Sequence, residues 1–142
     1  MAFLYFTTQY AIKTHDKIIE ISGGASGIND LGNLESPLFH IQNDDYYPYL
    51  EDKITHLVFA INKNHAFTDG NKRSSIALGA FFLELNGLDS MVSKFIIEME
   101  NIAVHVADNR IDKDLLFEII TSLIYEEDYS EELKLKIIES LS

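Results

Sequence analysis

Apolar residues recur three or four positions apart through most of the chain, and this spacing predicts amphipathic helices. Ser, Asn, Gly and Pro, the residues that commonly start or stop helices, lie between these runs. The expected helices cover residues 8–21, 34–39, 49–62, 71–86, 93–107, 113–125 and 131–141. Pro48 is expected in the first turn of the third helix, and Ser130 as the N-cap of the last. No convincing strand pattern follows the first few residues, so an all-α fold of about six to seven helices is predicted.

The chain contains no repeat and no linker, and its 142 residues suffice for one domain with a core. A single domain over residues 1–142 is therefore predicted. Residues 22–32 carry three glycines within five positions and are expected to be the most flexible segment. Small residues concentrate in the 71–86 helix, which suggests that it is central and closely packed: Ser74, Ser75, Ala77, Gly79 and Ala80.

The overall composition, 46% hydrophobic and 24% charged, is that of a soluble globular protein. The absence of cysteine excludes disulfides and thiolate metal sites and is compatible with a cytoplasmic location. No apolar run approaches the ~20 residues that cross a bilayer, and residues 1–6 do not resemble a signal peptide. The net charge of −12 argues against binding to polymeric nucleic acid. A single nucleotide remains compatible with it, because a local cation cluster such as Lys72 and Arg73 can hold phosphates.

The segment His-Ala-Phe-Thr-Asp-Gly-Asn-Lys-Arg at residues 65–73 concentrates the chemistry. An imidazole, His65, lies four residues before a carboxylate, Asp69, that can hold Mg²⁺. Gly70 allows a ligand to approach the backbone. Residues 71–73 then open a helix whose free amides and dipole favour an anion. A base, a metal carboxylate and phosphate donors together suit nucleotide phosphate transfer.

Each of these residues also has a plainer interpretation. Asp69 can be the N-cap of the following helix, and His65 a hydrogen-bonded loop histidine. Lys72 and Arg73 can be exposed residues of a first helical turn. Phe67 is expected in the core under either interpretation.

Taken together, the segment resembles the motif of the Fic/Doc family, in which His-x-Phe-x-Asp/Glu-Ala/Gly-Asn leads into a basic helix start. The resemblance covers about residues 4–110. Outside the motif it includes His15-Asp16, Gly23-Gly24, Gly27-Ile28, Leu34-Glu35-Ser36, Asn64-His65, Phe82-Leu83 and Asn86-Gly87.

The residues after Gly70-Asn71 indicate the branch of the family. Members that transfer AMP usually continue with Gly-Arg and carry a second Arg three residues later. Here Lys72-Arg73 follows, and the later position is Ile76. This form resembles the Doc, or death-on-curing, branch.

The resemblance implies a compact helical domain whose motif loop precedes a central helix. It implies a kinase-type transferase that moves the γ-phosphate of a nucleoside triphosphate, such as ATP, to a Ser or Thr hydroxyl of a target protein, often a translation factor. His65 would be the general base, Asp69 would hold Mg²⁺, and Phe67 would anchor the loop. The phosphates would be bound by Gly70, Asn71, Lys72 and Arg73. The 22–32 segment would correspond to the flap that lies beside the target, and simple loop flexibility is an equal explanation of its glycines.

Two other functions remain open: an AMP transferase acting on a protein hydroxyl, and a silent nucleotide- or partner-binding module. A faint match to the family's inhibitory Ser/Thr-x-x-x-Glu pattern runs from Ser122 to Glu126, but the Arg it would pair with is Ile76. Inhibition is therefore expected from a separate antitoxin chain. The acidic residues at 126–132 are expected to be a solvated surface, and the remaining histidines structural: His15, His40, His56 and His105.

Overall fold

The computed structural model describes residues 2–142, and these residues form an all-helical domain. Its helices are α1 (Thr8–Ser22), α2 (Leu31–His40), α3 (Leu50–Lys63), α4 (Asn71–Leu85), α5 (Val92–Ala107), α6 (Lys113–Tyr125) and α7 (Glu131–Ser140), with a 3-10 turn η1 (Asp89–Met91) before α5. Within the described residues the β-type pairing is confined to an isolated bridge between Ile28 and Phe67. The predicted all-α fold is confirmed.

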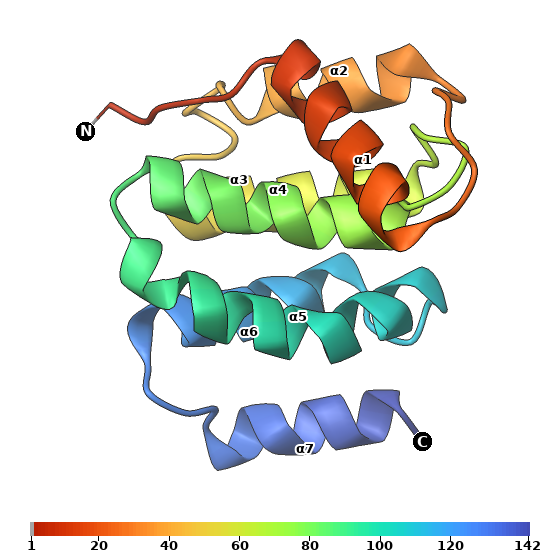
Figure 1. The fold of residues 1–142 in the computed structure, drawn as a ribbon. Helices are drawn as coiled ribbons and strands as arrows, with labels where there is room; N and C mark the ends of the chain where they lie inside the picture. Colours follow the sequence, from red (N-terminus) through yellow and green to blue (C-terminus); the bar gives the residue numbers. More distant parts are fainter. Residues whose placement is uncertain (1) are drawn as a thin grey trace.

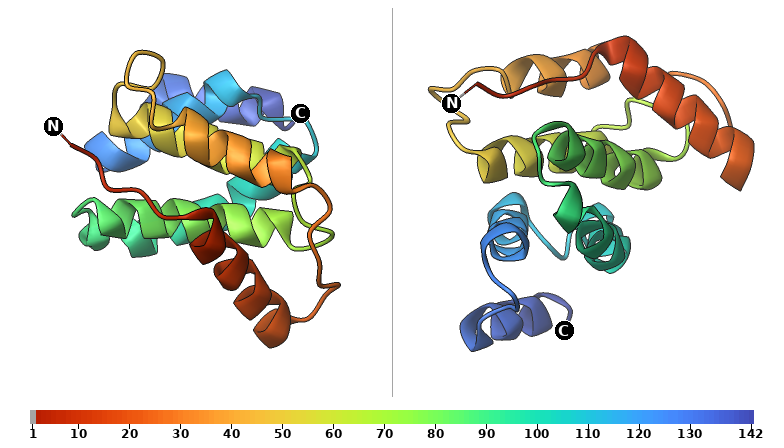
Figure 2. Two further views of the ribbon diagram at one scale, coloured as in Figure 1. Left: turned by 90° about the horizontal axis from the view of Figure 1, so that it is seen from above. Right: turned by 60° about the vertical axis from the view of Figure 1, so that its left-hand side comes forward.

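The helices stack in successive layers (Figure 1). α1 and α2 cover one side of the α3–α4 pair, α5 and α6 cover the other side, and α7 lies beyond α6 (Figure 2). α4 therefore packs against α1, α3 and α5. At its centre a Cβ on Gly79 would lie 2.8 Å from Val58 Cγ2 and 2.9 Å from Phe95 Cζ. The small residues of α4 thus allow two neighbouring helices to approach closely, as predicted.

Most predicted helix boundaries agree with the structure, and the differences have local causes. α2 begins at Leu31, earlier than predicted, because the Asp30 carboxylate caps it by accepting the N–H of Asn33. Pro48 lies before α3 and not in its first turn. The Asp52 carboxylate accepts the N–H of Tyr49 (3.0 Å), which makes Tyr49 the N-cap. Ser130 caps α7 as predicted, by accepting the N–H of Leu133.

The helix predicted over residues 8–21 forms as α1, and none of its isoleucines is fully buried. Its fully buried residues are Ala11 and His15, whereas Ile21 is 73% exposed. The reason is that α1 packs on α4 and on the loop before it with its small residue and its imidazole. A polar ring consequently occupies the centre of this interface.

A second histidine, His56 on α3, joins three helices. Its Nε2 lies 3.3 Å from His40 Nδ1 on α2, and its Nδ1 lies 2.8 Å from the Lys113 ammonium on α6. The hydroxyl of Tyr47, between α2 and α3, is 3.3 Å from the same Nδ1. Burial, and then the charges of Lys113 and His40, lower the pKa of His56 to about 4.

This lowered pKa predicts a loss of stability in mild acid. Between about pH 6.5 and pH 4 the unfolded chain binds a proton at residue 56 that the folded chain does not. The free energy of unfolding should therefore fall with decreasing pH across this window. Because His56 is only half-buried, we expect a discounted loss on the order of 1–2 kcal/mol. Urea unfolding at pH 6.5 and pH 4.5 would measure it. A His56→Gln variant with the wild-type pH slope would contradict the assignment.

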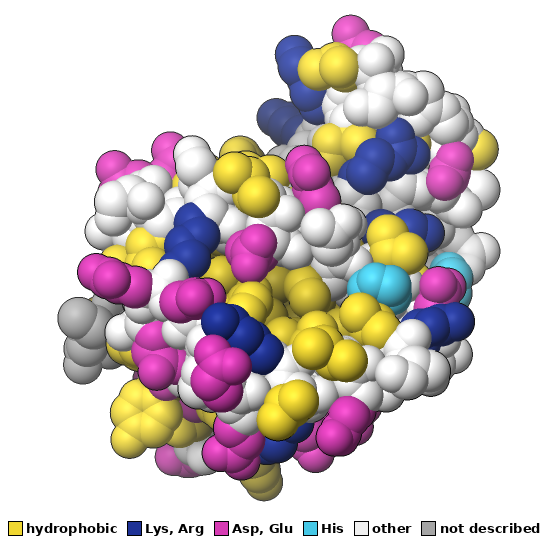
Figure 3. All heavy atoms as spheres, turned by 90° about the horizontal axis from the view of Figure 1, so that it is seen from below, with side chains coloured by type: hydrophobic (Ala, Val, Ile, Leu, Met, Phe, Trp, Pro, Cys, Tyr) yellow, Lys and Arg dark blue, Asp and Glu magenta, His cyan; other side chains and the backbone are white. Residues whose placement is uncertain are grey.

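The surface agrees with the predicted acidic balance. Figure 3 shows acidic side chains distributed over the face seen from below. The residues of the predicted acidic stretch, Glu126, Glu127, Asp128, Glu131 and Glu132, are all exposed. In the part of the chain that the structure describes, no helix has the length and apolar character needed to cross a membrane.

Candidate active site

The loop between α3 and α4 is fastened to the segment between α1 and α2 by an antiparallel series of hydrogen bonds. As the first segment advances from residue 64 to residue 73, the second segment runs back from residue 33 to residue 23. The donors and acceptors are Asn33 Nδ2 to Asn64 O, Asn29 Nδ2 to His65 O, the N–H groups of Asn29 and Asp30 to Ala66 O, Thr68 N to Gly27 O, Ala25 N to Asp69 Oδ2, and Arg73 Nη1 to Gly23 O. The glycine-rich segment therefore lies directly on the motif loop.

His65 stands at the exposed end of this arrangement. Its φ is +50°, a left-handed conformation that histidine adopts more readily than most residues. The carbonyl of His65 is held by the Asn29 side chain at 3.0 Å. The backbone is thereby fixed while the residue stays exposed.

Asn29 and Asn33 were not identified as site residues from the sequence. Each uses a side-chain N–H to hold a carbonyl of the loop, at His65 and Asn64 respectively. The available signal was their place beside residues that share the family resemblance, since Asn29 follows Gly27-Ile28 and Asn33 precedes Leu34-Glu35-Ser36. No spacing rule connects them with residues 64 and 65, because the contact depends on the fold.

Asp69 is not the N-cap of α4. That position is Gly70, which is left-handed (φ +78°, ψ 20°) and makes no side-chain capping bond. The Asp69 carboxylate instead accepts the N–H of Ala25 at 3.0 Å and of Gly70 at 2.8 Å. These two hydrogen bonds, followed by the charges of Arg73 and Lys72, hold the pKa of Asp69 below its usual value. The side chain is 47% exposed, so an ionised carboxylate is available at neutral pH.

Two features of the structure favour glycine at residue 70. Its positive φ strains any residue with a Cβ. A Cβ there would also lie 3.1 Å from Ile19 Cδ1 and 3.5 Å from His15 Nε2, both on α1. The tight turn into α4 therefore rests against α1.

Phe67 and Asn71 hold the loop together from inside. Phe67 is 1% exposed and belongs to the hydrophobic core, as predicted. The Asn71 carboxamide accepts the N–H of Phe67 at 3.1 Å and donates to its carbonyl at 2.9 Å. This side chain therefore braces the loop, and a phosphate contact at residue 71 would fall to its backbone N–H.

The start of α4 has the properties of an anion site. The first hydrogen bond of the helical ladder runs from Ser74 N to Gly70 O, so the N–H groups of residues 71–73 precede the ladder. Lys72 is exposed. Arg73 lies 4.0 Å from Asp69 and donates to the Gly23 carbonyl at 3.1 Å. Two cations and the positive end of a helix dipole thus lie beside one carboxylate.

A metal at this site would depend on Asp69 and on its ligand. No group of three or more His, Asp or Glu side chains suited to a metal occurs among residues 2–142. Mg²⁺ is commonly bound through one or two carboxylates together with substrate phosphates. One ionised, exposed carboxylate next to groups that can donate hydrogen bonds to a phosphate fits that mode.

Comparison with known proteins identifies the family of the chain. The sequence model described as "Fic/DOC family" matches residues 5–83, more than half of the chain. The chain belongs to the Fic/DOC family. It is 32% identical over 96 residues to "Toxin Doc" of Mycolicibacterium smegmatis, covering 65% of this chain and 74% of that protein. It is 31% identical over 88 residues to "Protein kinase doc" of Escherichia phage P1, covering 59% and 69% respectively. The Doc-like branch predicted from Lys72-Arg73 is confirmed.

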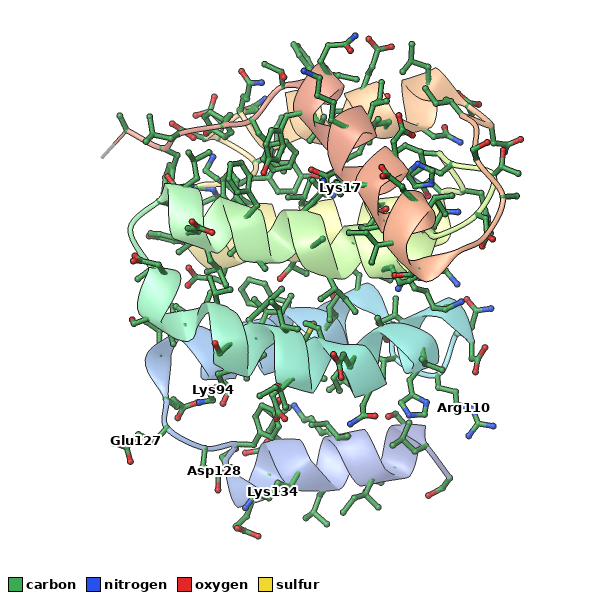
Figure 4. The ribbon with its side chains drawn as sticks, viewed as in Figure 1. Lys17, Lys94, Arg110, Glu127, Asp128 and Lys134 are labelled. Carbon is green, nitrogen blue, oxygen red and sulfur yellow. The ribbon has the colours of Figure 1, made fainter. Side chains whose placement is uncertain are left out.

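The inhibitory pattern considered for this Fic/DOC chain lies apart from the motif loop. Ser122 is buried in α6, a helix that packs against α3, α5 and α7. Lys94 on α5 donates to the carbonyls of Glu126 and Glu127 at the end of α6 (Figure 4). Ile76, in place of the second Arg, packs partly buried against the core. The Ser122–Glu126 segment therefore belongs to the α5–α7 corner.

Proposed function

We propose that this chain transfers the γ-phosphate of a nucleoside triphosphate, such as ATP, to a Ser or Thr hydroxyl of a target protein. The observation that carries the proposal is the exposed Lys72 beside Arg73 at the uncapped start of α4, next to the ionised Asp69. A long cation at residue 72 takes the place of the glycine found in AMP transferases and favours presentation of the terminal phosphate. The name of the phage relative, a protein kinase, supports the same reaction.

In the proposed reaction the target hydroxyl attacks the γ-phosphorus, and the bond from that phosphorus to the β–γ bridging oxygen breaks. His65 accepts the hydroxyl proton, and the nucleoside diphosphate leaves. The free N–H groups of residues 71–73, with Gly70, Lys72 and Arg73, bind the phosphates and orient them for in-line transfer. Mg²⁺, held by Asp69, would neutralise charge that develops on the phosphate oxygens.

The glycine-rich segment 22–32 is proposed to act as a flap that receives the target. Its central residues run antiparallel to Phe67 and Thr68, through the Ile28–Phe67 bridge and the bond from Thr68 N to Gly27 O. The adjacent residues 23–25 contact Asp69 and Arg73. A target strand lying along this segment would thus reach the exposed His65.

A label comparison tests the reaction type. Purified protein is incubated with a lysate, Mg²⁺, and ATP labelled at either the γ or the α position, and labelled bands are identified by mass spectrometry. Labelling from the γ position alone is the expected result. Labelling from the α position would instead show AMP transfer. Tight MgATP binding with no labelled protein would show a silent binding module.

The partner proposed to control this activity is a separate antitoxin chain. The relative named "Toxin Doc" supports a toxin–antitoxin setting. Within residues 2–142 the Ser122–Glu126 segment lies away from the loop, and Ile76 offers no charge for a glutamate to pair with. Adding the product of a neighbouring gene to the label comparison, and observing suppression, would identify the antitoxin.

A further inference from the structure

A buried imidazole outside the proposed reaction lies directly beneath the motif loop. His15 on α1 has no exposed surface. Its ring stacks on that of Phe67, with centroids 3.8 Å apart and planes 3° from parallel. Its Nε2 lies 2.6 Å from the Asp69 carbonyl oxygen, and its Nδ1 lies 3.4 Å from Asp16 Oδ1. One side chain therefore contacts the motif at two points.

The contact with the carbonyl places a hydrogen on Nε2 and holds the direction of the peptide. A carbonyl oxygen only accepts, so Nε2 carries the hydrogen and donates it. The Asp69 carbonyl belongs to the peptide that joins the proposed metal carboxylate to Gly70. The Gly70 end of this peptide donates its N–H to Asp69 Oδ1 at 2.8 Å. Rotation of the peptide would consequently move both the carboxylate and the start of α4.

The same ring also lies next to Gly70. A Cβ on Gly70 would lie 3.5 Å from His15 Nε2. Phe67, Asp69 and Gly70 thus meet one rigid planar group in the helix interface. An aliphatic residue of similar size would preserve the packing but would leave the Asp69 carbonyl without its donor.

We propose that His15 is a positioning residue for the phosphate-transfer site, acting through the hydrogen bond from its Nε2 to the Asp69 carbonyl. The effect of His15 on catalysis rests on the proposed function. The placement of the loop by His15 is a property of the ligand-free protein and can be measured there.

Three variants separate positioning from packing. His15→Leu fills the space and removes the donor, whereas His15→Gln keeps an N–H donor at a similar reach. Leu133→Ala on α7 removes a buried side chain, 6% exposed, and serves as a control for a loss of packing far from the loop. Thermal unfolding of each variant sets a temperature at which all are folded.

The first measurement is amide hydrogen exchange at Thr68 and Gly70 in the ligand-free protein. Loss of one buried hydrogen bond should accelerate exchange at these amides by about 10-fold in His15→Leu. His15→Gln should restore most of the protection, and Leu133→Ala should retain it. Exchange in His15→Leu equal to that of wild type or of Leu133→Ala would overturn the inference.

The second measurement is the Mg²⁺ dependence of transfer from γ-labelled ATP. His15→Leu should shift the Mg²⁺ midpoint upward and lower kcat by about 10-fold, with rescue by His15→Gln. Wild-type values in His15→Leu would overturn the catalytic consequence. A wild-type protein that transfers no phosphate would instead refute the proposed function, and exchange at Thr68 and Gly70 would still decide whether His15 positions the loop.

Discussion

Replacing His65 with alanine is expected to reduce transfer of the γ-phosphate by about 10²–10⁴-fold. The variant would lose the group proposed to accept the hydroxyl proton, while Asp69 and the start of α4 stay in place. His65 is exposed, and the Asn29 side chain holds only its backbone carbonyl. The free energy of unfolding should therefore change by no more than about 0.5 kcal/mol. Initial rates with γ-labelled ATP and a thermal melt would measure the two effects.

His40→Ala provides the matched control for this experiment. His40 is also an exposed histidine, but it lies at the end of α2 and contacts His56 instead of the loop. Its removal should leave the transfer rate unchanged. An activity of His65→Ala within a few-fold of wild type would exclude His65 as the base.

Among the substitutions considered, replacing Phe67 with alanine is expected to lower the free energy of unfolding most. Its side chain is 1% exposed, lies in the core cluster and stacks on His15. Removing a buried aromatic ring costs about 3–5 kcal/mol, a large part of a typical domain's stability. The melting temperature should fall by roughly 10–15 °C. Transfer activity should fall further, because the loop that carries His65 and Asp69 loses its anchor.

Phe39→Ala gives the comparison for this prediction. Phe39 is 76% exposed at the end of α2, so the same substitution removes little buried surface. Its melting temperature should remain within a few degrees of wild type. Equal losses in the two variants would show that Phe67 does not anchor the loop.

The helices were predictable because their signals are local. The interval from Lys113 to Tyr125 and the N-cap at Ser130 agree with the structure, since apolar spacing and capping residues act within a few positions. The 3-10 turn at Asp89–Met91 was not predicted. Three residues carry too short a pattern to distinguish such a turn from a loop.

The places of the candidate site residues in the fold were predictable, but their contacts were not. The motif placed His65 and Asp69 on one loop and Lys72 at the start of the helix that follows, and the structure agrees. It could not show that Asp69 would be held by Ala25, 44 positions away in the chain. It also could not show that His15 would donate to the Asp69 carbonyl, because hydrophobic spacing does not reveal a polar ring that is buried against a carbonyl. Such long-range polar contacts depend on how helices pack.

The placement of α7 makes it the helix that can unfold while the rest of the domain stays folded. α7 packs mainly on α6, and Leu133 is its buried residue. An element with so little buried surface opens at a small free-energy cost and can do so without the rest. The loop and the helices around it lie at the other end of the layered stack (Figure 1). Local fraying at the carboxyl end is therefore energetically separate from the order of the phosphate-binding turn.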